Sequence, residues 1–230
     1  MRIKTYFEDF LSLIYPVTCV SCGNLLPKSS PYVCPSCLYH LPKTKNHVVP
    51  VPQFAHKFEG IVKVDKVYVY SYFQKQGIVQ KILHELKYND NPEIGELFGK
   101  RFANDLKTDS EIRNFDMVIP VPLHPKKLKR RGYNQSEAVA IGMSQVLSAP
   151  VKCDLLFRKR HQETQTKRSK IERIKVMSET FDVVNTKLNG KHLLLVDDVL
   201  TTGATLISCV EKLQNLNPQS ISIAVLAGVK

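Results

Sequence analysis

The sequence predicts an α/β fold in which a parallel sheet is flanked by helices and preceded by a small cysteine-rich module. After about residue 64, apolar stretches of strand character alternate with stretches of helical periodicity. One run, Leu193–Val196, is apolar at every position, as in parallel strands that are buried on both faces. Four of the six cysteines lie within residues 19–37. We therefore expect two domains, residues 1–50 and residues 51–230.

The first fifty residues are too few and too rich in proline for a self-sufficient hydrophobic core. The apolar residues of segment 7–14 have helical spacing, and Pro16 ends this predicted helix. The cysteine module follows and runs to about His40. Residues 41–56, with three prolines, are predicted to form a linker.

The second domain is predicted as alternating strands and helices. The predicted strands cover residues 64–73, 117–121, 151–155, 192–196 and 220–226. The predicted helices cover residues 78–86, 94–106, 136–147 and 203–214. Strands separated by helices favour a parallel sheet with crossover helices on its faces. Residues 158–176 show no clear period, and we expect a long basic loop there.

Positive charge is concentrated in one part of the chain. The sequence has 33 Lys and Arg against 21 Asp and Glu, a formal charge of +12. Residues 120–175 hold 14 of the basic and 4 of the acidic residues, a net charge of +10. This span is either a solvated basic face or a surface for a polyanion, such as a phosphorylated small molecule or a nucleic acid.

The apolar runs of the sequence are short. The longest, near Ile221–Val229, has about half the roughly 18–20 residues that a membrane-spanning helix needs. Glu8 and Asp9 interrupt any signal-peptide apolar region at the start of the chain. We therefore expect no membrane insertion and a cytoplasmic location.

The four clustered cysteines have the spacing of a metal site: Cys19, Cys22, Cys34 and Cys37. They form two C-x2-C pairs separated by eleven residues, and two such pairs let four thiolates converge tetrahedrally on zinc. Four thiolates leave no open coordination position, so we predict a structural zinc in a zinc-ribbon-like module. Two redox dithiols or two disulfides are the alternatives. Cys153 and Cys209 are isolated, and we expect buried core thiols there.

The segment Leu193–Thr205 carries the chemistry that is most specific to a function. A buried strand ends in Asp197 and Asp198, and the sequence Thr201-Thr202-Gly203-Ala204-Thr205 then opens a helix. Glycine, threonine hydroxyls and the first helical N–H groups suit a phosphate, and ligands bind at the carboxyl ends of strands in open α/β sheets. Two acids beside a phosphate site fit a ligand that also carries hydroxyls. A ribose 5-phosphate meets both requirements.

Three other interpretations of this segment are a Walker B strand, a dinucleotide site and an ordinary strand, turn and helix. A Walker B strand would require a G-x-x-x-x-G-K-[ST] loop, and the chain has none. It also lacks a G-x-G-x-x-G dinucleotide fingerprint. An ordinary strand, turn and helix with a threonine cap is the remaining alternative.

Residues 196–205 resemble the phosphoribosyl pyrophosphate (PRPP) loop of type I phosphoribosyltransferases. The wider pattern resembles the ComF family of competence-associated, phosphoribosyltransferase-like proteins, in which a four-cysteine zinc module precedes such a domain. Three further segments carry this resemblance: Ile119-Pro120-Val121-Pro122-Leu123-His124, Arg131-Gly132-Tyr133-Asn134-Gln135, and Arg158-x-Arg160 with Gln165 and Arg173 before Phe181.

The resemblance implies roles for particular residues. Asp197 and Asp198 would be the catalytic acids and bind the ribose hydroxyls, while Thr201, Thr202, Gly203, Ala204 and Thr205 would bind the 5-phosphate. Candidate contacts to pyrophosphate or another anion are Arg131, Gly132, Asn134 and Gln135. Lys87 is a further candidate because of its position at the end of the first predicted helix of this domain, where it could instead stabilise the helix C-terminus. Lys126, Lys127, Lys129 and Arg130 lie just after the predicted strand 117–121 and would add positive charge there. Mg²⁺ would be carried mainly by the oxygens of PRPP.

Two functions of different classes follow from the resemblance. One is Mg²⁺-dependent phosphoribosyl transfer to an acceptor that the sequence does not identify. The other is a non-catalytic competence factor that binds single-stranded DNA or senses PRPP. The ComF family also implies a role in DNA uptake, with a competence helicase or another DNA-uptake protein as partner. The sequence supplies no obvious acceptor site, so it supports PRPP binding better than any specific transfer.

Overall fold

The computed structural model describes residues 16–27, 29–109, 112, 114–159 and 180–229. The predicted helix at residues 7–14 lies outside these ranges, as does nearly all of the predicted basic loop at 158–176. Gln165 and Arg173, which contribute to one of the motifs, also lie outside them.

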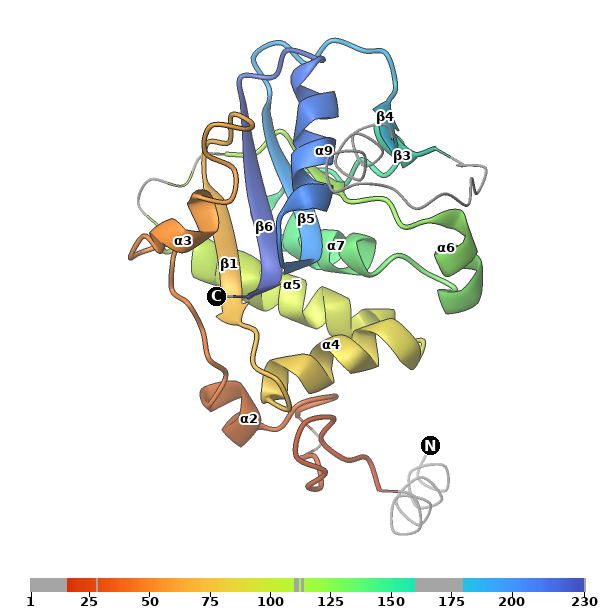
Figure 1. Cartoon of the computed structure of the whole chain (residues 1–230). Helices are drawn as coiled ribbons and strands as arrows, with labels where there is room; N and C mark the ends of the chain where they lie inside the picture. Colours follow the sequence, from red (N-terminus) through yellow and green to blue (C-terminus); the bar gives the residue numbers. More distant parts are fainter. Residues whose placement is uncertain (1–15, 28, 110–111, 113, 160–179, 230) are drawn as a thin grey trace, which may run out of the picture.

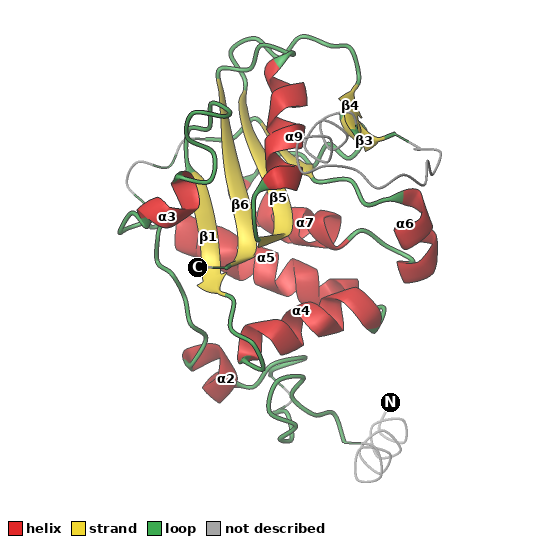
Figure 2. Ribbon diagram, in the orientation of Figure 1, coloured by secondary structure: helices red, strands yellow, loops and turns green. Residues whose placement is uncertain are grey.

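A parallel sheet of four strands forms the centre of the described structure (Figure 2). Its strands, in spatial order, are β1 (Val67–Tyr72), β6 (Ser220–Gly228), β5 (His192–Leu200) and β2 (Met117–Pro120). All three neighbouring pairs are parallel, which confirms the fold class predicted from the alternation of strands and helices. Because parallel strands end at the same edge, the segments that follow β2 and β5 lie next to each other.

Helices cover both faces of the sheet (Figure 1). One face packs against α4 (Ile78–Tyr88), α5 (Pro92–Leu106) and α7 (Gln135–Leu147), and the other against α3 (Pro52–Ala55) and α9 (Ala204–Gln214). Strand β5 shows why: Leu194 and Val196 belong to the first core, while Leu193 and Leu195 belong to the second. A strand that buries both faces must be apolar at successive positions, which is the pattern of this run.

Helices α5 and α7 approach closely because glycines face each other's backbone. A Cβ atom on Gly99 would lie 2.2 Å from the carbonyl oxygen of Val139, and one on Gly142 would lie 2.1 Å from that of Glu96. Any other residue at either position would push the helices apart. This contact fixes α7, whose first turn reaches the carboxyl end of β5.

Two predicted strands differ from the observed ones. The predicted strand at 151–155 is wrong: only Val151 forms a bridge to β2, and the strand that follows is β3 (Leu156–Arg158), paired antiparallel with β4 (Phe181–Val183). Tertiary pairing, which local sequence does not encode, decides this shift. Strand β5 is longer than predicted, because Val199 and Leu200 continue to pair with β6 beyond the two acids.

The segment predicted as a linker packs against the sheet. Leu41 is buried in the core that contains α4, and Phe54 of α3 is fully buried. Beside the outer edge of β1, the Asn46 side chain donates to the Val67 carbonyl and accepts from the Val69 amide. These contacts cover backbone groups at a sheet edge. The division into two domains at residue 50 stays a prediction.

The cysteine module lies on the far side of α4 from the sheet (Figure 1). Cys19, Cys34 and Cys37 belong to the same buried cluster as Ile82 of α4. Residues 35–39 form its short helix, α2 (Pro35–Tyr39). None of the helices in the described ranges has the length and apolar character that crossing a membrane requires.

Candidate functional site

An open cleft of about 550 Å³ lies between α4 and the carboxyl end of β5. It is lined by Phe73, Gln80, Leu83, His84, Lys87, Tyr88, Asp197, Asp198, Val199, Thr201 and Thr205. The cleft therefore brings together both acids, two threonines of the predicted phosphate turn and Lys87. These residues come from distant parts of the chain, and the sheet and α4 hold them around one space.

Asp197 is fixed by hydrogen bonds. Its Oδ1 atom accepts from the Ser136 hydroxyl at 2.8 Å and from the Asp198 amide at 2.9 Å. Ser136 lies in the first turn of α7, so the acid ties this helix to β5. Burial, and then the negative charge of Asp198, raise the pKa of Asp197 from 3.8 to about 7. Near neutral pH, Asp197 can therefore donate or accept a hydrogen bond.

Asp198 forms an ion pair across the cleft. Its Oδ2 atom lies 2.6 Å from the Nζ atom of Lys87, which is in the last turn of α4. The two side chains are 17% and 25% exposed, so the pair is only partly shielded from water. This contact places Lys87, which was predicted to contact an anion, directly beside the acid pair.

The turn between β5 and α9 has the backbone geometry expected of a tight turn. Gly203 has a φ of +84°, a left-handed conformation that a side chain would strain. Its carbonyl accepts from the Ile207 amide at 2.8 Å, so α9 starts directly after it. Thr201 and Thr205 line the cleft, whereas Thr202, Gly203 and Ala204 are not among its described lining residues. The start of an eleven-residue helix thus lies beside the two acids.

The segment after β2 forms a short helix, α6 (Pro125–Arg131). The motif at residues 131–135 begins with the last residue of α6, and hydrogen bonds within the protein hold it in place. Gly132 ends α6 with a φ of +77°, and the Asn134 side chain caps α7 and donates to the Val121 carbonyl at 3.0 Å. Gln135 is buried and accepts from Arg131 at 2.8 Å. Their predicted contact with an anion stays a prediction.

This motif also braces α4. The Tyr133 hydroxyl donates to the Leu86 carbonyl, and the Arg131 guanidinium lies over the Tyr88 ring, 5.5 Å from its centre. Both contacts are with the last turn of α4, where Lys87 is located. The motif therefore sets the position from which Lys87 reaches Asp198.

Sequence reasoning missed the wall of the cleft that α4 provides. Gln80, His84 and Tyr88 are exposed and spaced four residues apart, so they lie on one face of this helix. The His84 and Tyr88 rings are 4.7 Å apart. Their four-residue spacing could have been found in the sequence. The sequence of the helix does not, however, indicate that this polar face lies opposite β5.

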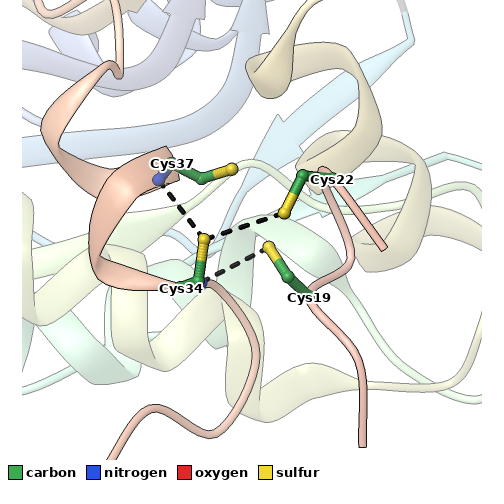
Figure 3. A group of neighbouring side chains, drawn as sticks. All are labelled: Cys19, Cys22, Cys34 and Cys37. Carbon is green, nitrogen blue, oxygen red and sulfur yellow. Dashed lines mark hydrogen bonds between the residues drawn. The ribbon is translucent and has the colours of Figure 1, made fainter. Parts of the chain in front are cut away.

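The four predicted zinc ligands converge at one point (Figure 3). Their sulfur atoms all lie within 4.8 Å of one another, and all four are free thiols. Cys22 and Cys34 have a sulfur–sulfur distance of 3.7 Å. Tetrahedral zinc with bonds of about 2.3 Å places its sulfur ligands about 3.8 Å apart. The cluster could therefore hold such an ion.

Backbone amides support the cluster. The Cys34 amide donates to the Cys19 sulfur at 3.3 Å, and the Cys37 amide donates to the Cys34 sulfur at 3.4 Å (Figure 3). Such donors stabilise thiolates, the form that binds metal. The first pair lies in a turn with Gly23 at a φ of +77°, and the second at the start of α2. Of the other two cysteines, Cys209 is buried as predicted, whereas Cys153 is exposed, which the prediction missed.

Parts of the chain are similar to known proteins. Residues 132–230 match the family described as phosphoribosyl transferase domain. The chain is 30% identical over 139 residues to competence protein ComFC of Bacillus subtilis, and 31% identical over 127 residues to competence protein F of Haemophilus influenzae. These stretches are 60% and 54% of this chain. Over these stretches the chain is similar to the competence proteins, and residues 132–230 match the phosphoribosyl transferase domain.

The chain is also 27% identical over 135 residues, or 57% of its length, to DNA utilization protein YhgH of Escherichia coli O157:H7. The matched stretches are 53% of ComFC, 56% of competence protein F and 59% of YhgH, so the chain spans little more than half the length of these relatives.

Solved structures of lower similarity include glutamine PRPP amidotransferase from B. subtilis, complexed with ADP and GMP. It is 20% identical, covers 62% of this chain and 30% of that one, and has a TM-score of 0.43. Adenine phosphoribosyltransferase of Saccharomyces cerevisiae is 11% identical, covers 77% and 89%, and has a TM-score of 0.38. Neither likeness assigns a function to this chain.

The raised pKa of Asp197 predicts how stability depends on pH. Between about pH 4 and pH 7 the folded protein holds a proton on Asp197 that the unfolded chain has released, so its free energy of unfolding falls as pH rises. Asp197→Asn keeps an oxygen for Ser136 and the Asp198 amide but cannot ionise. Relative to this variant, the unmodified protein should lose up to about 1.4 kcal/mol per pH unit. Urea unfolding across this pH range measures the difference.

Asp182→Asn provides the control, because a hydrogen bond from Lys159 lowers the pKa of Asp182. Its stabilising contribution is lost only as pH falls below the ordinary carboxyl range, so this variant should show the same dependence between pH 4 and 7 as the unmodified protein. Parallel profiles for the unmodified protein and Asp197→Asn would contradict the prediction.

Proposed function

We propose that this chain binds PRPP in the cleft between α4 and β5. Asp197 and Asp198 would hold the ribose hydroxyls, and the turn Thr201–Thr205 would hold the 5-phosphate. One observation carries the proposal: both acids, Thr201 and Thr205 line the same open space at the carboxyl end of a buried parallel strand. Hydroxyl donors and the first N–H groups of α9 suit a phosphate, while carboxylates suit a diol.

The reaction that this arrangement favours is transfer of the phosphoribosyl group to a nucleophilic acceptor. Bound Mg²⁺ would supply positive charge to the pyrophosphate leaving group, as carboxylate and phosphate oxygens are its preferred ligands. Lys87 lines the same cleft and would add a second cation, and the two acids would orient the sugar. The bond from C1 to pyrophosphate would break as the bond to the acceptor forms. The acceptor is not identified, and PRPP binding without transfer is the narrower form of the proposal.

Removal of the Asp198 carboxylate tests the sugar site. Asp198→Ala should weaken PRPP binding in the presence of Mg²⁺ by about 1.5–3 kcal/mol, because the ribose hydroxyls lose a charged acceptor. Isothermal titration calorimetry measures the affinity, and thermal unfolding checks that the variant is folded.

A matched control is Asp116→Ala, at the opposite edge of the same sheet. Asp116 also pairs with a lysine, Lys191, at 2.8 Å, so both variants lose one ion pair. Only the loss of the Asp198 carboxylate should weaken PRPP binding. Equal affinities for all three proteins, or no PRPP binding by the unmodified protein, would refute the proposed site. Release of pyrophosphate across a panel of nucleobases and amines then tests for transfer.

For the cysteine cluster we propose a structural zinc ion. The chain should carry about one zinc per molecule, and Cys34→Ser should release it and lower the unfolding temperature, because zinc binding contributes to folding. Metal analysis and thermal unfolding measure the two effects. Cys153→Ser is the control, since this cysteine lies outside the cluster and is exposed. Retention of zinc by Cys34→Ser would contradict the assignment.

A second candidate function, binding of single-stranded DNA, is favoured by α6. Lys126, Lys127, Lys129 and Arg130 are all exposed on this helix, and its last residue, Arg131, contacts Tyr88 at the cleft. The names of the relatives, competence and DNA utilization proteins, agree with it. In this form the cysteine module would dock a DNA-uptake partner such as a helicase.

Salt dependence tests this second function. Affinity for a single-stranded oligonucleotide should fall steeply with salt, and Lys127→Gln/Lys129→Gln should reduce the slope of log affinity against log salt by about 1–2. Fluorescence anisotropy measures the affinity. The exposed pair Lys63→Gln/Lys75→Gln has the same charge change away from α6 and should have a smaller effect. Absence of binding at low salt would rule this function out.

A further inference from the structure

Lys87 is the single lysine or arginine among the described residues that line the cleft. Its ammonium group lies 2.6 Å from the Oδ2 atom of Asp198. Lys87, the cation available to an anionic ligand, is therefore already paired. Its partner, Asp198, is also the acceptor proposed for the sugar hydroxyls.

The contact with Lys87 offsets repulsion between the two acids. Asp197 and Asp198 are neighbours in β5, and the negative charge of Asp198 acts on Asp197. A cation beside one of the two acids reduces this repulsion. Asp197 accepts hydrogen bonds from neutral donors, Ser136 and a backbone amide, so the compensating charge comes from Lys87 alone among the described cleft residues.

The last turn of α4 is anchored, whereas the Lys87 side chain that it carries is long and flexible. The last turn of α4 is held by Tyr133, which donates to the Leu86 carbonyl, and by Arg131, which lies over Tyr88. From this fixed base, a flexible four-carbon stem with three ammonium donors can change partners within the cleft. The Lys87 side chain is 25% exposed, so the open space of the cleft is accessible to it.

We propose that Lys87 is a positioning residue that exchanges partners: it holds Asp198 in the free protein and donates to the diphosphate of the ligand in the complex. The exchange releases Asp198 to accept from the sugar hydroxyl. It makes tight binding depend on the diphosphate, because a sugar monophosphate offers Lys87 no group near C1 that could draw it away from Asp198. The inference rests on the proposed PRPP site and adds a basis for selectivity to it.

The test compares two ligands, PRPP with Mg²⁺ and ribose 5-phosphate, by isothermal titration calorimetry. Lys87→Met keeps the apolar stem and removes the ammonium group. It should lower PRPP affinity by about tenfold or more, the worth of a charge-assisted hydrogen bond, while ribose 5-phosphate binds as well as before or better. Lys87→Arg keeps the charge and should restore most of the preference for PRPP. Lys191→Met removes the equivalent partner of Asp116 and should change neither affinity.

Each other result overturns the exchange. Equal losses for both ligands would mean that Lys87 only orients Asp198, and unchanged PRPP affinity would mean that it does not reach the diphosphate. A loss confined to ribose 5-phosphate would reverse the proposed order of partners. Failure of the unmodified protein to bind either ligand would instead refute the PRPP site itself, so the two failures are distinguishable. Thermal unfolding of each variant confirms that the affinities refer to folded protein.

Discussion

The candidate site depends on the backbone pairing of β5, which continues with β6 past the two acids as far as the buried Leu200. Asp197 and Asp198 therefore lie within a strand of the central sheet, and not in a flexible connection. A rigid support of this kind holds polar groups in one geometry, which the proposed recognition of a sugar would require.

That rigidity has an electrostatic cost, and the surrounding residues offset it. Burial, and then the negative charge of Asp198, raise the pKa of Asp197 to about 7. Ser136 at the start of α7 and Lys87 at the end of α4 supply a hydrogen bond and a positive charge. The close glycine contact between α5 and α7 matters here, because it brings the first turn of α7 to the acids.

Helix α4 connects the two parts of the molecule that carry functional residues. Its apolar face packs into the core shared with Cys19, Cys34 and Cys37, and Lys81 donates to the Ser21 carbonyl in the cysteine module. A neighbouring face of α4 lines the cleft. The motif at residues 131–135, which resembles a ComF segment, acts on the same helix through Tyr133 and Arg131. Cysteine module, motif and cleft thus share one element.

The sequence by itself determined the parallel α/β class, the convergence of the four cysteines, and the strand, acid pair and turn of the candidate site. Each is encoded locally, in apolar periodicity or in the spacing of a few neighbouring residues. Only the tertiary structure decided that Lys87 pairs with Asp198, that α4 forms a wall of the cleft, and that residues 41–46 cover the edge of β1. It also decided that the strand in this region is β3, at Leu156–Arg158, and not the predicted segment 151–155. These features depend on which distant segments meet when both faces of the sheet are buried, and spacing along the chain does not carry that information.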